Sequence, residues 1–109
     1  MDKLIVFDEM DAPSTGGTFK VGSINGVSYD QLWNYLGEPT FDEPSGDDKT
    51  QVEWVVEFND EIFTIYDWKT YDRHYTKNSL TTWSIGGKSN GSDLADYIKS
   101  QIKELELPF

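Results

Sequence analysis

A glycine-rich stretch that ends in Gly-Lys-Ser is the part of this sequence closest in pattern to a phosphate-binding motif. It reads WSIGGKS and covers residues 83–89. In a phosphate-binding loop, consecutive backbone N–H groups turn inward around the phosphate, and the pattern requires an earlier glycine at the position that Thr82 occupies here. Because that glycine is absent, we predict that Gly86 and Gly87 only let the chain leave a sheet edge and turn toward the last helix.

Acid–base catalysis is the next chemistry to consider, and the sequence does not specify it. The only histidine, His74, follows Asp72 and Arg73 in a polar stretch. A general base needs an orienting partner and reach to a substrate, and neither is identified here, so we expect a solvated loop histidine. Twenty acidic residues allow many carboxylate pairs, which makes any one pair unspecific. We therefore expect a protein that is not an enzyme.

A calcium loop is the only metal site that the spacing of acidic residues suggests. Asp42 and Glu53 are the first and last residues of a stretch of twelve. Its third and fifth positions are Pro44 and Gly46, which offer no side-chain oxygen, and Asp47 stands where the loop requires glycine. The pattern therefore fails, and we expect neither a metal nor a cofactor.

The charge of the chain restricts its partners. It has 20 acidic residues against 9 basic ones, a net charge of −11. Such a charge repels nucleic acid and anionic membranes over long range. We expect no direct binding of nucleic acid, no membrane association and a partner that is basic.

Length and composition indicate one folded domain that spans residues 1–109. The absence of cysteine excludes disulfides, a thiolate nucleophile and a thiolate zinc site, and it fits a reducing compartment. The apolar run from Leu4 to Phe7 is too short for a signal peptide or a membrane span. We therefore expect a cytoplasmic protein.

The clearest element is a strand over residues 52–58, because apolar residues alternate strictly with others from Val52 to Phe58. If Asn59 and Asp60 form a two-residue hairpin loop, Val56 pairs with Phe63 and Trp54 with Ile65. This register puts the large apolar residues of both strands on one face. The opposite face then mixes aromatic and acidic side chains.

The remaining elements are two helices, three further strands and polar connections. Ser28 and Gln31 form a capping box for a helix over 29–36, and Ser92 is the expected N-cap of a helix over 93–105. Further strands are predicted at 4–7, 18–23 and 80–85, with exposed connections at 38–50 and 69–79. The fold class is therefore α+β: an antiparallel sheet of three to five strands with two helices packed on one face. A phosphate-binding loop of the Gly-Lys-Ser type follows a parallel strand, whereas the strand over 80–85 belongs to a predicted antiparallel sheet. The fold class therefore also argues against a nucleotide site.

Acidic residues concentrate in the middle of the chain. From Glu38 to Glu61 there are nine of them against Lys49 alone: Glu38, Asp42, Glu43, Asp47, Asp48, Glu53, Glu57, Asp60 and Glu61. One interpretation is a solvated, solubilising surface. The other is a surface that resembles the phosphate row of a nucleic acid, which requires acids from several segments to converge.

Three segments resemble small proteins encoded in tailed-bacteriophage genomes. They are NGVSYDQLWNYLGEP (25–39), EWVVEFNDEIFTIYDWK (53–69) and WSIGGKSNG (83–91), and the pairing of IYDWK with W-x-IGG is the most specific part. The resemblance implies a counter-defence inhibitor of the anti-CRISPR or anti-restriction type, which acts in the cytoplasm of the host cell. It assigns no role to any residue.

The leading hypothesis is a phage inhibitor that binds a host defence nuclease or nucleic-acid-recognition complex and blocks its nucleic-acid site by DNA mimicry. Its candidate contacts are Asp42, Glu43, Asp47, Asp48, Glu53 and Glu57, with Tyr66 and Trp68 as aromatic anchors. The alternative is an interaction module that is not a mimic, either a homodimer or a phage assembly factor. That module would bind through Val55, Ile62, Tyr66 and Trp68 on an open sheet face.

Overall fold

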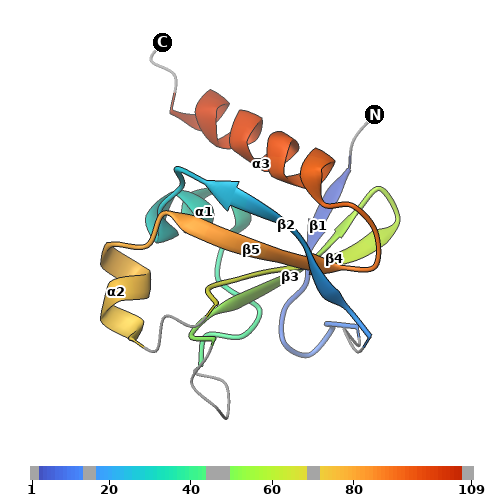
Figure 1. The fold of residues 1–109 in the computed structure, drawn as a ribbon, viewed down its shortest axis with the longest axis horizontal. Coiled ribbons are helices and arrows are strands. Elements are labelled where there is room, and N and C mark those ends of the chain that lie inside the picture. The colour runs from blue at the N-terminus through green and yellow to red at the C-terminus, as the bar shows by residue number, and fades with distance from the viewer. Residues whose placement is uncertain (1–2, 14–16, 44–49, 69–71, 107–109) are drawn as a thin grey trace.

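The computed structural model describes residues 3–13, 17–43, 50–68 and 72–106. These residues form one antiparallel sheet and three helices (Figure 1). The strands are β1 (Leu4–Val6), β2 (Phe19–Asn25), β3 (Glu53–Phe58), β4 (Glu61–Tyr66) and β5 (Thr82–Gly87), and the helices are α1 (Tyr29–Leu36), α2 (Arg73–Asn78) and α3 (Ser92–Leu105). The strand order is β1-β3-β4-β5-β2. The predicted α+β class is confirmed.

The hairpin of β3 and β4 has the predicted register. Trp54 lies opposite Ile65, and Val56 lies opposite Phe63. The two loop residues, Asn59 and Asp60, have φ angles of 50° and 69°. Positive φ at both positions gives the turn a twist that matches the strands, and Asn and Asp tolerate this conformation better than most residues.

The N-terminal strands occupy the two opposite edges of the sheet. β1 pairs with β3, and β2 pairs with β5. The sequence alone did not identify the strand that pairs with β2. One face of the sheet lies on the side away from α3 (Figure 1). Val55 and Thr64 face that side, yet their exposed fractions are only 0% and 3%. The middle of this face is therefore covered.

The other face of the sheet packs against α1 and α3 and forms the core. Trp54 and Trp83 meet there edge to face, with ring centroids 5.7 Å apart, and both are fully buried. Each indole N–H donates to a backbone carbonyl: Trp54 to Gly37 at 3.0 Å and Trp83 to Val27 at 2.8 Å. The register had placed Trp54 on the buried face, as found, and the polar atoms of both tryptophans are satisfied.

Helix α1 begins with the predicted capping box. The Ser28 hydroxyl accepts from the Gln31 backbone N–H, and the Gln31 side chain accepts from the Ser28 backbone N–H. These two bonds satisfy donors that have no partner within the helix. At the other end Gly37 takes a φ of 87°, which ends the helix where the sequence predicted.

Two predictions about helix ends and connections are wrong. Helix α3 starts at Ser92 itself, with Gly91 as its N-cap and no side-chain cap. The connection predicted at 69–79 contains α2, because the Asp72 side chain accepts from the backbone N–H groups of His74 and Tyr75. His74 is exposed, as expected, but it lies on this helix rather than in a loop.

The predicted role of Gly86 and Gly87 is also wrong, because both lie within β5, between β4 and β2. A Cβ atom added at Gly87 would lie 2.7 Å from the Phe63 ring, and one at Gly86 would lie 2.6 Å from Oγ1 of Thr64. The two glycines therefore make room for side chains on opposite faces of the sheet. Since both belong to a strand, they do not form a loop that could hold phosphate.

Candidate functional site

The predicted contact residues fall into separate groups. Asp47 and Asp48 lie outside the described residues. Glu53, Tyr66 and Trp68 meet at one end of the sheet face that the helices leave free, whereas Glu57 lies further along β3 on that face. Asp42 and Glu43 lie in the segment between α1 and β3. The predicted surface is therefore divided.

The first group surrounds a shallow cavity of about 200 Å³, which we call the aromatic pocket and which is lined by Thr18, Phe19, Thr50, Glu53, Thr64, Tyr66, Trp68 and Gly86. The Tyr66 and Trp68 rings meet edge to face, with centroids 6.1 Å apart and planes at 85°. Trp68 is 49% exposed and Phe19 is 64% exposed. Aromatic groups that are exposed and held by a neighbour suit protein binding, because they bury much area with little loss of entropy.

Glu53 supplies the negative charge of the aromatic pocket. It lies directly opposite Tyr66 in the β3–β4 register. Burial raises the pKa of Glu53 above its ordinary value. Burial also raises the pKa of the Tyr66 hydroxyl, and the charge of Glu53 adds to that effect. A carboxylate with reduced hydration beside two rings can pair with a cation from a partner more favourably than a fully hydrated one.

At the other end of the same face an acid lies between apolar residues. Glu57 lies opposite Ile62 on β4 and opposite Ile5 on β1, so its neighbours across the strands are apolar. Between this end and the aromatic pocket lies Val55, which is 0% exposed. The prediction that Val55 belongs to an open interaction surface is therefore wrong, because Val55 is fully buried.

The segment that carries Asp42 and Glu43 is fixed against the sheet. Phe41 and Glu53 exchange two backbone hydrogen bonds of 2.9 Å, which places this segment beside β3. Oγ1 of Thr40 donates to the Phe7 carbonyl at 2.6 Å and accepts from the Val55 N–H at 2.9 Å. The two acids are therefore held at the β1–β3 edge of the sheet.

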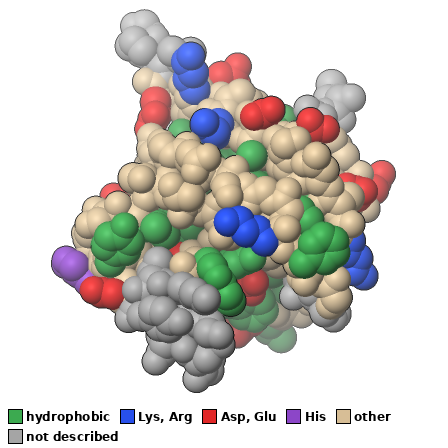
Figure 2. Space-filling view, in the orientation of Figure 1, with side chains coloured by type: hydrophobic (Ala, Val, Ile, Leu, Met, Phe, Trp, Pro, Cys, Tyr) green, Lys and Arg blue, Asp and Glu red, His purple; other side chains and the backbone are tan. Residues whose placement is uncertain are grey.

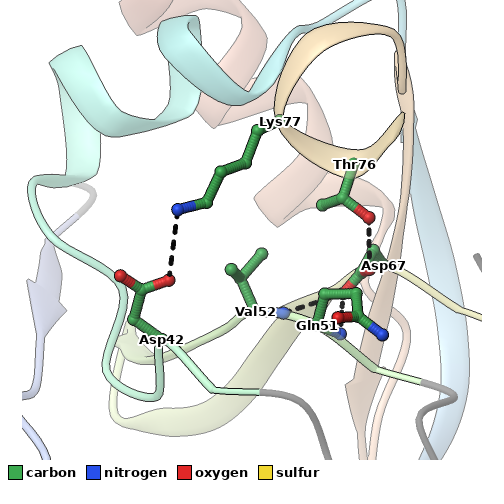
Figure 3. Close-up of polar contacts among 6 residues, drawn as sticks. All are labelled: Asp42, Gln51, Val52, Asp67, Thr76 and Lys77. Atoms are coloured by element: carbon green, nitrogen blue, oxygen red, sulfur yellow. Dashed lines mark hydrogen bonds and ion pairs between the residues drawn. The ribbon is translucent and has the colours of Figure 1, made fainter. Parts of the chain in front are cut away.

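Asp42 also contacts helix α2. Its carboxylate lies 3.8 Å from Nζ of Lys77, and both side chains are 35% exposed (Figure 3). Nζ of Lys77 is in turn 5.5 Å from the centre of the Tyr29 ring. A half-exposed ion pair of this kind contributes little to stability.

Sequence reasoning missed the most connected acid of the region, Asp67. This residue is fully buried. One of its oxygens accepts from the backbone N–H groups of Gln51 at 2.8 Å and Val52 at 3.0 Å, and the other accepts from Oγ1 of Thr76 at 2.7 Å (Figure 3). Asp67 thus holds the end of β4 and positions Trp68. The only signal in the sequence was its place within IYDWK, directly after a strand.

Charge is dispersed over the face of the molecule drawn in Figure 2. There, acidic side chains are scattered around the outline, and lysines and hydrophobic side chains lie between them. The described acidic residues on this face therefore form no continuous patch. Of the described acids that sequence reasoning assigned to contacts, Glu53 lies alone at the aromatic pocket, whereas Asp42 and Glu43 lie together at the β1–β3 edge.

Metal binding and membrane spanning have no support in the described part of the chain. No group of three or more His, Asp and Glu side chains in it could hold a metal ion. Nor does any helix within it have the length and apolar character to cross a membrane.

Comparison with known proteins gives no relative: no protein-family model, no curated protein and no solved structure matches this chain. The resemblance to tailed-phage proteins stays a prediction. Function must therefore be argued from the site.

Proposed function

We propose that the protein is a non-enzymatic inhibitor that binds a basic, nucleic-acid-binding protein of the host and occupies its nucleic-acid site. The observation that carries this proposal is the position of Glu53, a partly buried carboxylate, against the partly buried Tyr66 and the exposed Trp68. A net charge of −11 supports a partner of opposite charge. The phage resemblance suggests a defence nuclease or its recognition complex as that partner.

Binding would combine two effects. An arginine from the partner's groove can stack on the face of Trp68 and pair with Glu53, since guanidinium groups favour both aromatic and carboxylate neighbours. Acids at the rim, with Asp42, Glu43 and Glu57 among them, would steer the two proteins together and speed association. Single-stranded nucleic acid uses its bases and phosphates in the same two ways, which is why such a surface can compete with it.

The test is affinity capture from a bacterial lysate, followed by competition. We expect the wild-type protein to recover a nuclease or nucleic-acid-recognition complex and to displace a labelled oligonucleotide from it. The Trp68→Ala variant should lose most of this binding, while Trp33→Ala, which removes a half-exposed tryptophan on α1, should retain it. A complex that binds the protein and its nucleic acid at the same time would contradict occupation of that site.

A second candidate is an interaction module that is not a mimic, and it rests on the apolar character of the free sheet face. Phe19 and Trp68 are largely exposed, and Ile62 is only partly buried. Such a face could serve a homodimer or a phage assembly factor. Sedimentation of a dimer that the Trp68→Ala variant abolishes, or capture of virion components, would favour this candidate over the first.

A further inference from the structure

A second concave surface lies at the β1 edge, away from the aromatic pocket. It is a groove of about 440 Å³ between the end of β1 and the segment that follows α1. Its apolar lining comes from both sides: Val6 ends β1 and Phe7 follows it, while Leu36 ends α1 and Pro39 lies just beyond that helix. A groove with such a floor can hold the methylene groups of a long side chain.

The rim of this groove is acidic. Its acidic lining residues are Asp8, Glu9, Glu38, Asp42 and Glu43, and the described residues of its lining include no lysine or arginine. Within the described part of the chain, Glu9, Glu38 and Glu43 make no hydrogen bond or ion pair. Negative charges along one rim attract a cation.

The walls of the groove are fixed by backbone contacts. On one side the Phe7 N–H donates to the Val55 carbonyl at 3.0 Å, and on the other Thr40 is bonded to Phe7 and Val55. The side chain of Asp8 accepts from the Asp11 N–H at 2.9 Å, which holds the turn after β1. A groove whose walls are already ordered binds with a smaller loss of entropy.

We propose that this groove binds an arginine side chain of a protein partner, with the methylene groups on the apolar floor and the guanidinium group among the rim carboxylates. Arginine fits better than lysine, because its planar group pairs with carboxylates through two parallel hydrogen bonds and is more weakly hydrated. A metal ion fits poorly, since no three acidic side chains of the described residues converge on one point. The inference rests on the proposed function, in which the partner is basic.

The experiment uses a peptide, so that it tests the groove separately from the partner. Acetyl-Leu-Arg-Leu-amide is titrated into the ¹⁵N-labelled protein, with acetyl-Leu-Gln-Leu-amide as the matched uncharged probe. We expect saturable shifts of the Phe7 and Thr40 amide signals with the arginine peptide and no comparable shifts with the glutamine peptide. The Glu9→Gln/Glu38→Gln variant should weaken binding roughly tenfold, the loss expected for about two exposed ion pairs.

A control variant separates local from overall charge. Asp96→Asn/Glu104→Gln removes two exposed acids from α3, so its net charge equals that of the groove variant. It should bind the arginine peptide within about twofold of wild type, because distant exposed charges are screened. Equal weakening by both variants, equal shifts by both peptides, or shifts that avoid the groove would overturn the proposal. If the peptide test fails but the protein still captures a nuclease complex, the proposed function holds and the groove is not part of the binding site.

Discussion

Oγ1 of Thr76 donates a hydrogen bond to Oδ2 of Asp67 over 2.7 Å, and this contact joins helix α2 to the end of β4 (Figure 3). Both residues are fully buried. Since Oδ1 of Asp67 also holds the backbone of Gln51 and Val52, one carboxylate connects three segments of the chain. It thereby fixes the strand end that carries Trp68.

We expect Asp67→Ala to lower the free energy of unfolding by at least about 3 kcal/mol, because it leaves buried backbone donors without this acceptor. Asp67→Asn keeps one oxygen and the shape, so it should cost less, and Thr76→Val should cost about 1–2 kcal/mol. Urea denaturation measures all three. If Asp67→Ala costs no more than the exposed control Asp96→Ala, the network does not stabilise the fold.

The tryptophans should differ sharply in their effect on stability. Trp54 and Trp83 are 0% exposed, so replacing either by Ala should cost about 3–5 kcal/mol. Trp68 is 49% exposed, and Trp68→Ala should cost about 1 kcal/mol or less. Chemical denaturation with tyrosine and tryptophan fluorescence provides the measurement. Equal losses at the three positions would contradict the assignment of the sheet faces.

Gly87→Ala should destabilise the fold by about 1–3 kcal/mol, since the added methyl group would press on the Phe63 ring in the core. The same substitution in a Phe63→Leu background should cost less, because the leucine side chain can rotate away. Denaturation of the four proteins in this cycle gives the coupling between the two positions. No coupling would mean that Gly87 is needed for another reason.

Local patterns in the sequence predicted the helices and strands well, but they did not predict contacts between distant parts of the chain. Alternation from Val52 to Phe58 and the Asn59-Asp60 turn fixed the β3–β4 register, since both signals are local. The pairing of β2 with β5 joins distant parts of the chain, and no local signal specifies it. For the same reason the sequence could not find the groove at the β1 edge.

The pH dependence of stability should reveal the burial of Glu53. Its pKa is raised in the fold, so the native state binds more protons than the unfolded state just above the ordinary carboxyl pKa. Stability from this group therefore falls as pH rises through that range and remains lower at neutral pH. Glu53→Gln removes this penalty, and we expect it to stabilise the protein at neutral pH and to do so less as the pH falls toward 4.5.

The control for this experiment is Glu57→Gln, which removes the same charge from the same strand and the same face. Comparing the two variants in urea at both pH values separates the burial of Glu53 from a general reduction of negative charge. A gain for Glu53→Gln that is the same at both pH values would contradict the assignment. If Glu53→Gln increases the stability at neutral pH, the native carboxylate in the aromatic pocket lowers the stability of the fold. Functional sites often have such a cost in stability.

The last prediction separates DNA mimicry from aromatic docking by means of salt and charge reversal. Asp47→Lys/Asp48→Lys reverses two acids in the stretch with the most negative charge, and Asp96→Lys/Glu104→Lys makes the same change of net charge on α3. If the acids of residues 42–57 occupy a basic groove, the first variant should bind the captured partner much more weakly than the second. Its association rate should fall most, because rim charges act mainly on encounter.

Raising the salt concentration from about 0.05 to 0.5 M should weaken the wild-type complex in the same way, since the distance over which charges interact shortens to a few ångströms. Surface plasmon resonance over that range, with circular dichroism to verify folding, gives both rates. A complex that resists salt and the Asp47→Lys/Asp48→Lys reversal, yet is lost with Trp68→Ala, would be held by the aromatic pocket. The central acids would then be a solvated surface, and the interaction module would be the better account of this protein.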